Sequence, residues 1–124
     1  MLRVFSKIMG QRCPTQEASG TLFGTWTGEG YQASGSKWSI ALVSQGASAG
    51  VTISYPSLNC GGRWTLIEGK PHLAWFRETI TYGKKSCLDG GKIAVTPVES
   101  GYLTFSYFSP EGKLLAWSTL ARAK

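Results

Sequence analysis

Residues 37–55 read K-W-S-I-A-L-V-S-Q-G-A-S-A-G-V-T-I-S-Y, and their pattern indicates the fold more clearly than any other part of the chain. Apolar residues stand at every second position in 38–42 and again in 51–55, separated by small or hydroxyl residues. Successive side chains of a strand point to opposite faces, so each run predicts a strand with one buried face. The link 45–50 is too short for a parallel crossover, which makes these two strands antiparallel neighbours.

Similar runs, separated by Gly, Pro, Ser and Asp, recur along the chain from Thr21 onward. The expected strands are Leu22–Tyr31, Lys37–Ser44, Gly50–Tyr55, Arg63–Ile67, His72–Thr81, Lys92–Pro97, Tyr102–Phe108 and Lys113–Leu120. Short strands at this spacing are typical of an all-β sandwich or barrel. An antiparallel eight-stranded up-and-down barrel removes every exposed sheet edge and is the predicted fold, with a two-sheet β-sandwich as the alternative.

The chain of 124 residues is long enough for one compact domain, predicted over residues 21–124. Residues 1–20 are expected to be an N-terminal extension or linker, either frayed or forming a short helix. The apolar residues of the segment 1–12 share one helical face, which would allow contact with a membrane, although frayed polypeptide is the simpler interpretation. Arg3, Ser6 and Lys7 interrupt its apolar residues, so no signal peptide or membrane-spanning helix is visible here.

Composition excludes some classes of partner. The formal net charge is +6, but most lysines stand beside Gly, Pro or Ser in predicted turns, where charged side chains protect the ends of sheets. No stripe of Arg and Lys with interleaved aromatic residues marks a nucleic-acid surface. A solvated basic surface is the simple interpretation of the charge, and an acidic partner is the alternative.

Cys60 and Cys87 are expected to form a disulfide, because both lie in turn-rich sequence and no Cys/His cluster offers zinc its ligands. Such a bond persists in oxidising compartments and therefore favours a periplasmic, cell-surface or secreted location. Two buried thiols in a cytosolic protein are the alternative.

Two resemblances extend this prediction. The motif G-T-W-T-G at 24–28, with Arg122 after the last strand, resembles the calycin arrangement of lipocalins and avidins, which implies that the arginine packs over Trp26 at the closed end of a barrel. Nothing in the chain matches the biotin-binding residues of avidins. The strings Y-P-S-L-N-C-G-G at 55–62 and C-L-D-G-G at 87–91 are similar to a small β domain of bacterial secreted proteins and of extracytoplasmic tails of some Ser/Thr kinases. That resemblance implies an extracellular domain with Cys60 paired to Cys87 and no catalysis.

Glu78 is the most informative candidate site residue. Strand alternation places it on one face with Phe76, Ile80 and Tyr82, and a carboxylate among these residues inside a barrel must be paired or hydrogen-bonded. Arg63, Arg122 or a tyrosine hydroxyl are the possible partners. Glu78 is then either a group that orients a ligand or half of a structural ion pair. The remaining ligand-binding candidates are Trp75 and Arg77 on the opposite face of the same strand, together with Tyr31, Tyr55, Asn59 and Trp64.

Catalytic chemistry finds little support in the residues. His72 is the single histidine, no serine lies in a G-x-S-x-G motif, and the acidic residues have no spacing that makes two converge. No metal ligand set or cofactor motif is visible. The sequence therefore predicts a non-catalytic extracytoplasmic module that binds a small ligand, a glycan or a protein. An interaction, inhibitor or accessory module using the loops around Asn59 and Lys84–Lys85 is the alternative, and a small hydrolase is a third hypothesis.

Overall fold

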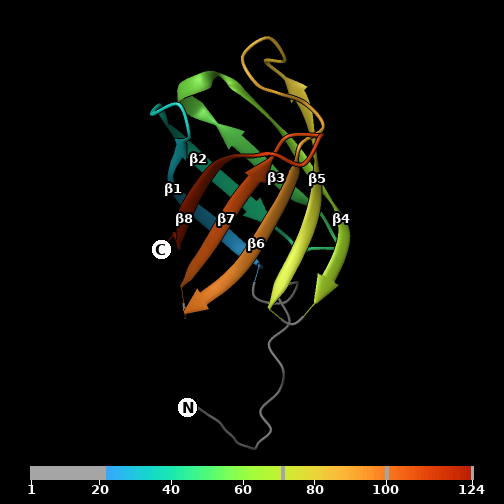
Figure 1. The fold of residues 1–124 in the computed structure, drawn as a ribbon. Coiled ribbons are helices and arrows are strands. Elements are labelled where there is room, and N and C mark those ends of the chain that lie inside the picture. The colour runs from blue at the N-terminus through green and yellow to red at the C-terminus, as the bar shows by residue number, and fades with distance from the viewer. Residues whose placement is uncertain (1–21, 71, 100, 124) are drawn as a thin grey trace, which may run out of the picture.

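The computed structural model describes residues 22–70, 72–99 and 101–123. The expectations for residues 1–20, including membrane contact by 1–12, lie outside the described residues. The strands are β1 (Gly24–Gln32), β2 (Lys37–Ser44), β3 (Val51–Tyr55), β4 (Cys60–Lys70), β5 (Leu73–Tyr82), β6 (Lys92–Glu99), β7 (Tyr102–Phe108) and β8 (Leu114–Arg122), and a short 3-10 helix, η1 (Pro56–Leu58), precedes β4 (Figure 1). The described part of the chain contains no helix long and apolar enough to cross a lipid bilayer.

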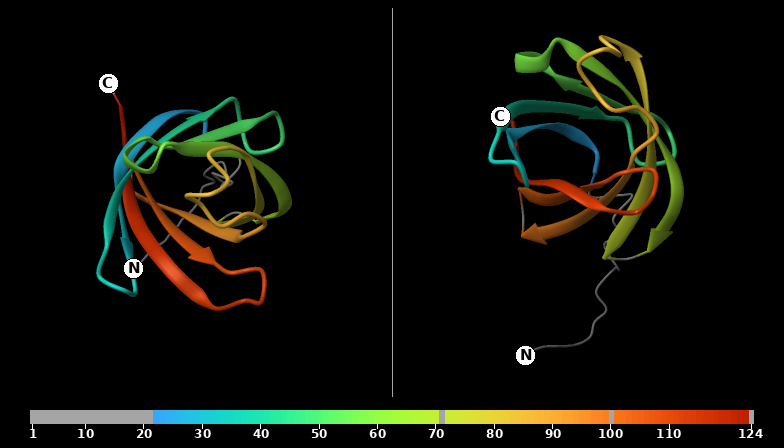
Figure 2. Two further views of the ribbon diagram at one scale, coloured as in Figure 1. Left: turned by 90° about the horizontal axis from the view of Figure 1, so that it is seen from above. Right: turned by 45° about the horizontal axis from the view of Figure 1, so that its top comes forward.

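The eight strands form a closed antiparallel up-and-down barrel in which each strand pairs with the next. β8 pairs with β1 along their length, from Trp26 opposite Arg122 to Gln32 opposite Ala116, so the sheet has no free edge. Seen from above, the ribbon closes into a ring (Figure 2). The predicted barrel is confirmed, and the alternative of a two-sheet sandwich is wrong.

One predicted boundary is substantially wrong. The fourth strand was expected to begin at Arg63, but β4 begins at Cys60, and Gly61 and Gly62 are buried members of the sheet. A Cβ added at Gly62 would overlap the carbonyl oxygen of Thr79 and lie 2.8 Å from the Cα of Ile80. The glycine pair therefore permits close approach of β4 and β5, with an irregular register between Gly61 and Gly62. Close packing of backbones, and not a turn, explains these two glycines.

The barrel interior is largely filled by side chains. Trp26, Phe76 and Phe105 are among the largest side chains that are fully buried. The ring of Trp64 lies 5.3 Å from that of Phe76 and 5.6 Å from that of Phe105, centroid to centroid. At eight strands the interior is just wide enough for side chains to fill it, which is the outcome here.

Trp26 near the start of β1 and Arg122 at the end of β8 lie opposite each other, at the end of the barrel away from the connection 33–36. The indole Nε1 of Trp26 donates a hydrogen bond to the carbonyl oxygen of Leu22 at 3.0 Å, and the Arg122 guanidinium carbon lies 4.2 Å from the centre of the Trp26 ring. Arg122 also donates to the carbonyl oxygen of Phe23 at 2.6 Å. The expected packing of this arginine over the first-strand tryptophan is confirmed.

The opposite, upper end of the barrel carries the connections 33–36, 56–59, 83–91 and 109–113. Cys60, at the start of β4, forms a disulfide with Cys87 in the connection 83–91, and their Cα atoms lie 6.3 Å apart. The predicted cysteine pair is thus confirmed. It holds the longest upper connection against the wall of the barrel.

Candidate functional site

A cavity of about 100 Å³ lies at the upper end of the barrel, and we call it the mouth. It is bordered by elements from around the ring, including the starts of β2 and β8, the end of β3, η1 and the connection 83–91. The side chains that matter most below are Trp38, Tyr55, Glu78, Tyr107, Leu88 and Leu115. Five of these six are aromatic or aliphatic, and one is a carboxylic acid.

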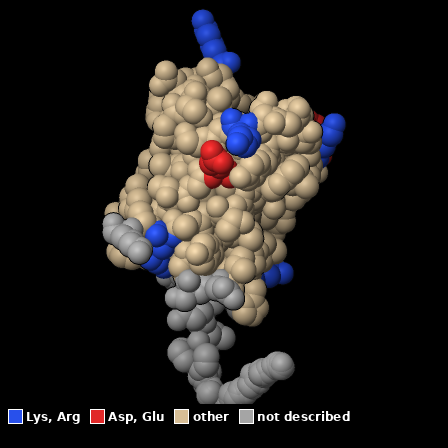
Figure 3. Space-filling model, turned by 90° about the vertical axis from the view of Figure 1, so that its left-hand side faces the viewer, with Lys and Arg blue, Asp and Glu red and all other residues tan. Residues whose placement is uncertain are grey.

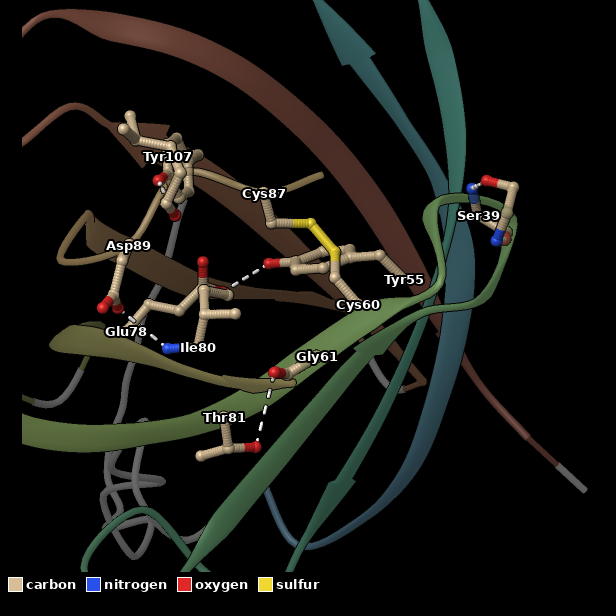
Figure 4. Close-up of a disulfide and its surroundings, with 12 residues drawn as sticks. Ser39, Tyr55, Cys60, Gly61, Glu78, Ile80, Thr81, Cys87, Asp89 and Tyr107 are labelled. Carbon is tan, nitrogen blue, oxygen red and sulfur yellow. Dashed lines mark hydrogen bonds between the residues drawn. A yellow bond between two sulfur atoms is a disulfide. The ribbon is translucent and has the colours of Figure 1, made fainter. Parts of the chain in front are cut away.

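Glu78 reaches the mouth because β5 points alternate side chains inward. Its side chain is 1% exposed, and its neighbours Phe76 and Ile80 on the same face are also buried. Its Oε2 accepts hydrogen bonds from the Tyr55 hydroxyl at 2.5 Å and from the Trp64 indole Nε1 at 2.9 Å. Figure 4 shows the carboxyl pointing toward Tyr55, close to the disulfide. Of the three possible partners, the structure therefore shows a tyrosine hydroxyl, that of Tyr55.

The two arginines predicted as alternative partners of Glu78 lie elsewhere. Arg63 is exposed on the outer wall, because the alternation along β4 points its neighbour Trp64 inward. Arg122 stacks on Trp26 at the opposite end of the barrel. Among the described residues, no Lys or Arg pairs with Glu78, so the hypothesis of a structural ion pair is wrong for this part of the chain.

The second oxygen of the Glu78 carboxyl faces the mouth without a protein donor. Both side-chain hydrogen bonds end on Oε2, and no residue of the described ranges donates a hydrogen bond to Oε1. A carboxyl oxygen that is buried and unpaired costs free energy unless another molecule supplies a donor or an acceptor. Oε1 is therefore the group in the mouth that most requires an external partner.

Burial controls the acid–base properties of this cluster. Burial raises the pKa of the Glu78 carboxyl, the hydrogen bonds from Tyr55 and Trp64 lower it in part, and the nearby Asp89 carboxylate raises it further. Burial, followed by the charge of Glu78, raises the pKa of Tyr55 well above its ordinary value. The same two causes, in the same order, raise the pKa of Tyr107, with Asp89 contributing in addition. The raised pKa values favour the neutral forms of Glu78, Tyr55 and Tyr107.

The connection 83–91 is anchored beside Glu78 by hydrogen bonds at its second half. The Glu78 N–H donates to the carbonyl oxygen of Gly91 at 2.9 Å, and the Gly90 N–H donates to the Glu78 carbonyl at 3.1 Å. The Asp89 carboxylate accepts from the Ile80 N–H at 2.9 Å, and the Tyr107 hydroxyl donates to the Leu88 carbonyl at 3.0 Å. With the disulfide, these bonds fix the rim of the mouth.

The structure brings together three of the seven predicted ligand-binding candidates: Glu78, Tyr55 and, beneath the cavity, Trp64. The other four are not in the mouth. Trp75 lies against Phe108, with ring centres 5.5 Å apart, and the guanidinium of Arg77 donates to the Gly90 carbonyl at 3.0 Å. Both therefore have roles on the outer wall.

Tyr31 and Asn59 are also outside the mouth. Tyr31 is 41% exposed on the outer wall, directly opposite Trp117 of β8. Asn59 has a left-handed backbone, with φ of 55°, and its N–H donates to the Pro56 carbonyl, so the residue makes the turn between η1 and β4.

Sequence reasoning missed the contribution of Trp38, Tyr107 and Leu115 to the mouth. Alternation does place Trp38 and Tyr107 on inward faces, and both lie at strand ends that an up-and-down barrel brings to its upper rim. A search for inward-facing residues that also stand close to the upper end of their strand would have identified Trp38 and Tyr107. Leu115 gave no such signal, because its strand begins beside a register shift and the run 114–117 is apolar on both faces.

Replacing Glu78 with glutamine tests the buried carboxyl through the pH dependence of stability. Because its folded-state pKa is raised above 4.5, the folded protein binds more protons than the unfolded chain between the two values. The stability that Glu78 contributes is therefore greatest below its unfolded pKa and is lost as pH rises through the folded pKa. Glu78→Gln should gain stability relative to the wild type over that window, by about 1.4 kcal/mol for each unit of pKa elevation.

Chemical denaturation of both proteins at several pH values between 4 and 8 measures this difference. Glu29→Gln, at an exposed position, is the control and should run parallel to the wild type. Parallel curves for Glu78→Gln would show that the carboxyl is not buried as described.

Within the described residues, no group of three or more His, Cys, Asp or Glu side chains is arranged to hold a metal ion. Comparison of the chain with protein-family models, with curated proteins and with solved structures finds no match.

Proposed function

We propose that this protein is a non-catalytic binding module that takes a small ligand in the mouth, with a polar head group against Glu78. One observation carries the proposal: Oε1 of a carboxyl that is 1% exposed lines a cavity and lacks a donor among the described residues. Ligand sites are typically concave and mostly apolar, with a few polar groups that fix orientation. The mouth has this composition.

The size of the mouth limits the ligand. A cavity of about 100 Å³ is smaller than the roughly 300–1,000 Å³ of sites that enclose drug-sized molecules. The head group alone would therefore be enclosed, and any longer body would extend out of the mouth toward solvent. Because the core beneath is filled by Trp64 and Phe105, the barrel offers no deep central chamber.

We further propose an extracytoplasmic location and kinship with bacterial secreted domains. The Cys60–Cys87 disulfide is compatible with an oxidising compartment. The packing of Arg122 over Trp26 supports a calycin-like relationship, and the strings around the two cysteines support the likeness to secreted proteins and kinase tails. A comparison of disulfide content in the exported and cytosolic protein from its native host tests the location.

A substitution that fills the mouth with a larger side chain, Leu115→Trp, tests the proposed function. Leu115 is half-buried and lines the cavity, whereas its neighbour Leu114 is exposed and does not. In a screen of small molecules followed by NMR, ligands should move the indole N–H signals of Trp38 and Trp64. Leu115→Trp should weaken these ligands by about tenfold or more, since it fills space that a desolvated head group needs. Leu114→Trp is the matched control and should leave affinity unchanged.

Ligands that keep their affinity for Leu115→Trp would contradict the proposal, as would a screen in which no compound moves either indole signal. A correctly folded Leu115→Trp variant is recognised by the dispersion of its remaining amide signals.

A protein-interaction module remains the second candidate, and the adjacency of two loops favours it. The backbone of Gly83 packs directly against the carbonyl of Asn59, so the loops around Asn59 and Lys84–Lys85 form one continuous rim. Both lysines are exposed there. On the side of the molecule drawn in Figure 3, Lys and Arg are scattered and do not gather into one patch. Leu115→Trp separates the small-ligand module from the protein-interaction module. A partner protein bound by this rim keeps its affinity for the variant, whereas a small molecule inside the mouth loses affinity.

A further inference from the structure

The chemistry of the mouth identifies a class of ligand, an inference that rests on the proposed function. We propose that the head group is an alkylammonium ion, bound by Oε1 of Glu78 and by the aromatic rings of Trp38, Tyr55 and Tyr107. Three independent features of the site support it: the orientation of the carboxyl, the sign of the surrounding charges and the nature of the walls.

The Glu78 carboxyl is held in a fixed orientation in which only one of its two oxygens, Oε2, accepts hydrogen bonds from the protein. Tyr55 and Trp64 both donate to Oε2, which locks the plane of the group and leaves Oε1 toward the cavity. An ammonium group has three N–H donors and no acceptor, so it can satisfy an oxygen that only accepts. A hydrogen bond between a buried carboxylate and a cation is also stronger than one between neutral groups.

The titratable groups around Glu78 are acids, and among the described residues no basic side chain balances the charge of its carboxylate. From β3, β7 and the connection 83–91, the titratable groups that act on it are Tyr55, Tyr107 and Asp89, all of them acids. The nearest basic residues along the chain do not compensate it, because Arg77 donates to the Gly90 carbonyl on the outer wall and the exposed Lys84 and Lys85 do not line the mouth. An ammonium ion would supply the missing positive charge.

The walls suit a cation that carries carbon. Trp38 and Tyr55 meet edge to face, with ring centres 5.3 Å apart and planes at 83°, so their rings present differently oriented surfaces to the mouth. Aromatic rings attract alkylammonium groups through the negative charge on their faces. The cavity of about 100 Å³ suits a small head group and is too small to enclose a drug-sized molecule.

Four probes of matched chain length test the head group: n-butylammonium, 1-butanol, butyramide and butanoate. At pH 8 the ammonium probe should bind about tenfold or more tightly than 1-butanol, because it alone pairs with the ionised carboxyl. Its affinity should fall as pH is lowered, because protonation of Glu78 competes with the cation for Oε1. At a pH low enough for Glu78 to be protonated in the free protein, calorimetry in two buffers with different heats of ionisation should detect release of the carboxyl proton on binding of the ammonium probe, which a neutral probe would not cause.

Glu78→Gln should remove the preference for n-butylammonium and retain weak binding of 1-butanol, while the exposed Glu29→Gln should behave as the wild type. The wild-type pH series gives a result even if Glu78→Gln folds poorly. Equal or tighter binding of 1-butanol or butyramide, with movement of the Trp38 and Trp64 signals, would overturn the cation inference and leave the proposed function standing. Absence of binding by all four probes would overturn the cation inference, and the wider screen with Leu115→Trp would then decide the function separately.

Discussion

Replacing Gly62 with alanine is expected to lower the free energy of unfolding by about 3 kcal/mol or more, or to prevent folding. An added Cβ would collide with the Thr79 carbonyl and the Ile80 Cα, both of them backbone atoms that cannot rotate away. Overpacking in a dense core typically costs about 1–3 kcal/mol, and here the strain also falls on a ladder of hydrogen bonds. Urea denaturation followed by tryptophan fluorescence measures the loss.

Gly69→Ala is the matched control, because Gly69 lies in the same strand and an added Cβ there meets only the Leu66 side chain at 3.9 Å. Alanine at this position should be neutral or stabilise by up to about 1 kcal/mol through the lower entropy of the unfolded chain. Equal effects of the two substitutions would contradict the close approach of β4 and β5 at Gly62.

Removing the disulfide is expected to be the second large perturbation. Cys60 and Cys87 are separated by 27 residues, and closing a loop of that length contributes about 3–4 kcal/mol in the chain-entropy model. Cys60→Ser/Cys87→Ser should therefore lower the free energy of unfolding by about this amount. Ligand affinity should also fall, because Cys87 and the neighbouring Leu88 form part of the wall of the mouth.

Reduction of the wild-type protein supplies the control for this variant. Reduced wild type and the double variant should unfold at the same denaturant concentration, and the oxidised wild type at a higher one. Identical stability before and after reduction, with no mass change of two hydrogens, would show that the two cysteines are not joined.

Alternation of apolar residues was sufficient to predict the architecture. The runs that became β2, β3 and β7 alternate cleanly, and their inward residues, such as Ile40, Ile53 and Phe105, are buried as the pattern requires. Short connections then leave few topologies other than an up-and-down order. Closure between β1 and β8 follows from the need to pair the two remaining edges.

Glycine was harder to interpret than alternation, because it has more than one physical use. Gly61 and Gly62 resemble a turn in sequence but serve close packing of strands, and only the position of β5 reveals this. Asp89–Gly90 has the sequence of a tight hairpin turn, yet Asp89 accepts the Ile80 N–H and the whole connection 83–91 folds over the barrel rim. Both cases depend on contacts between segments that are distant in the chain.

The site could be predicted in part. The strand period correctly places Glu78 inward, and the cost of burying a carboxyl correctly requires a hydrogen-bond partner. Choosing among Arg63, Arg122 and a tyrosine required knowledge of which end of the barrel each occupies. Arg63 is excluded because its strand points Trp64 inward, and Arg122 is excluded because it stacks on Trp26 at the other end of the barrel.

A crystal structure with a bound ligand tests the central claim, that the open oxygen of Glu78 is a ligand-binding group, most directly. Crystals would be soaked with the small molecule that most strongly moves the Trp64 indole signal. The account predicts a polar atom of that molecule within about 3.2 Å of Oε1, with Oε2 still bonded to Tyr55 and Trp64. A ligand bound on the outer wall, or a mouth that holds only water at saturating ligand, would contradict it.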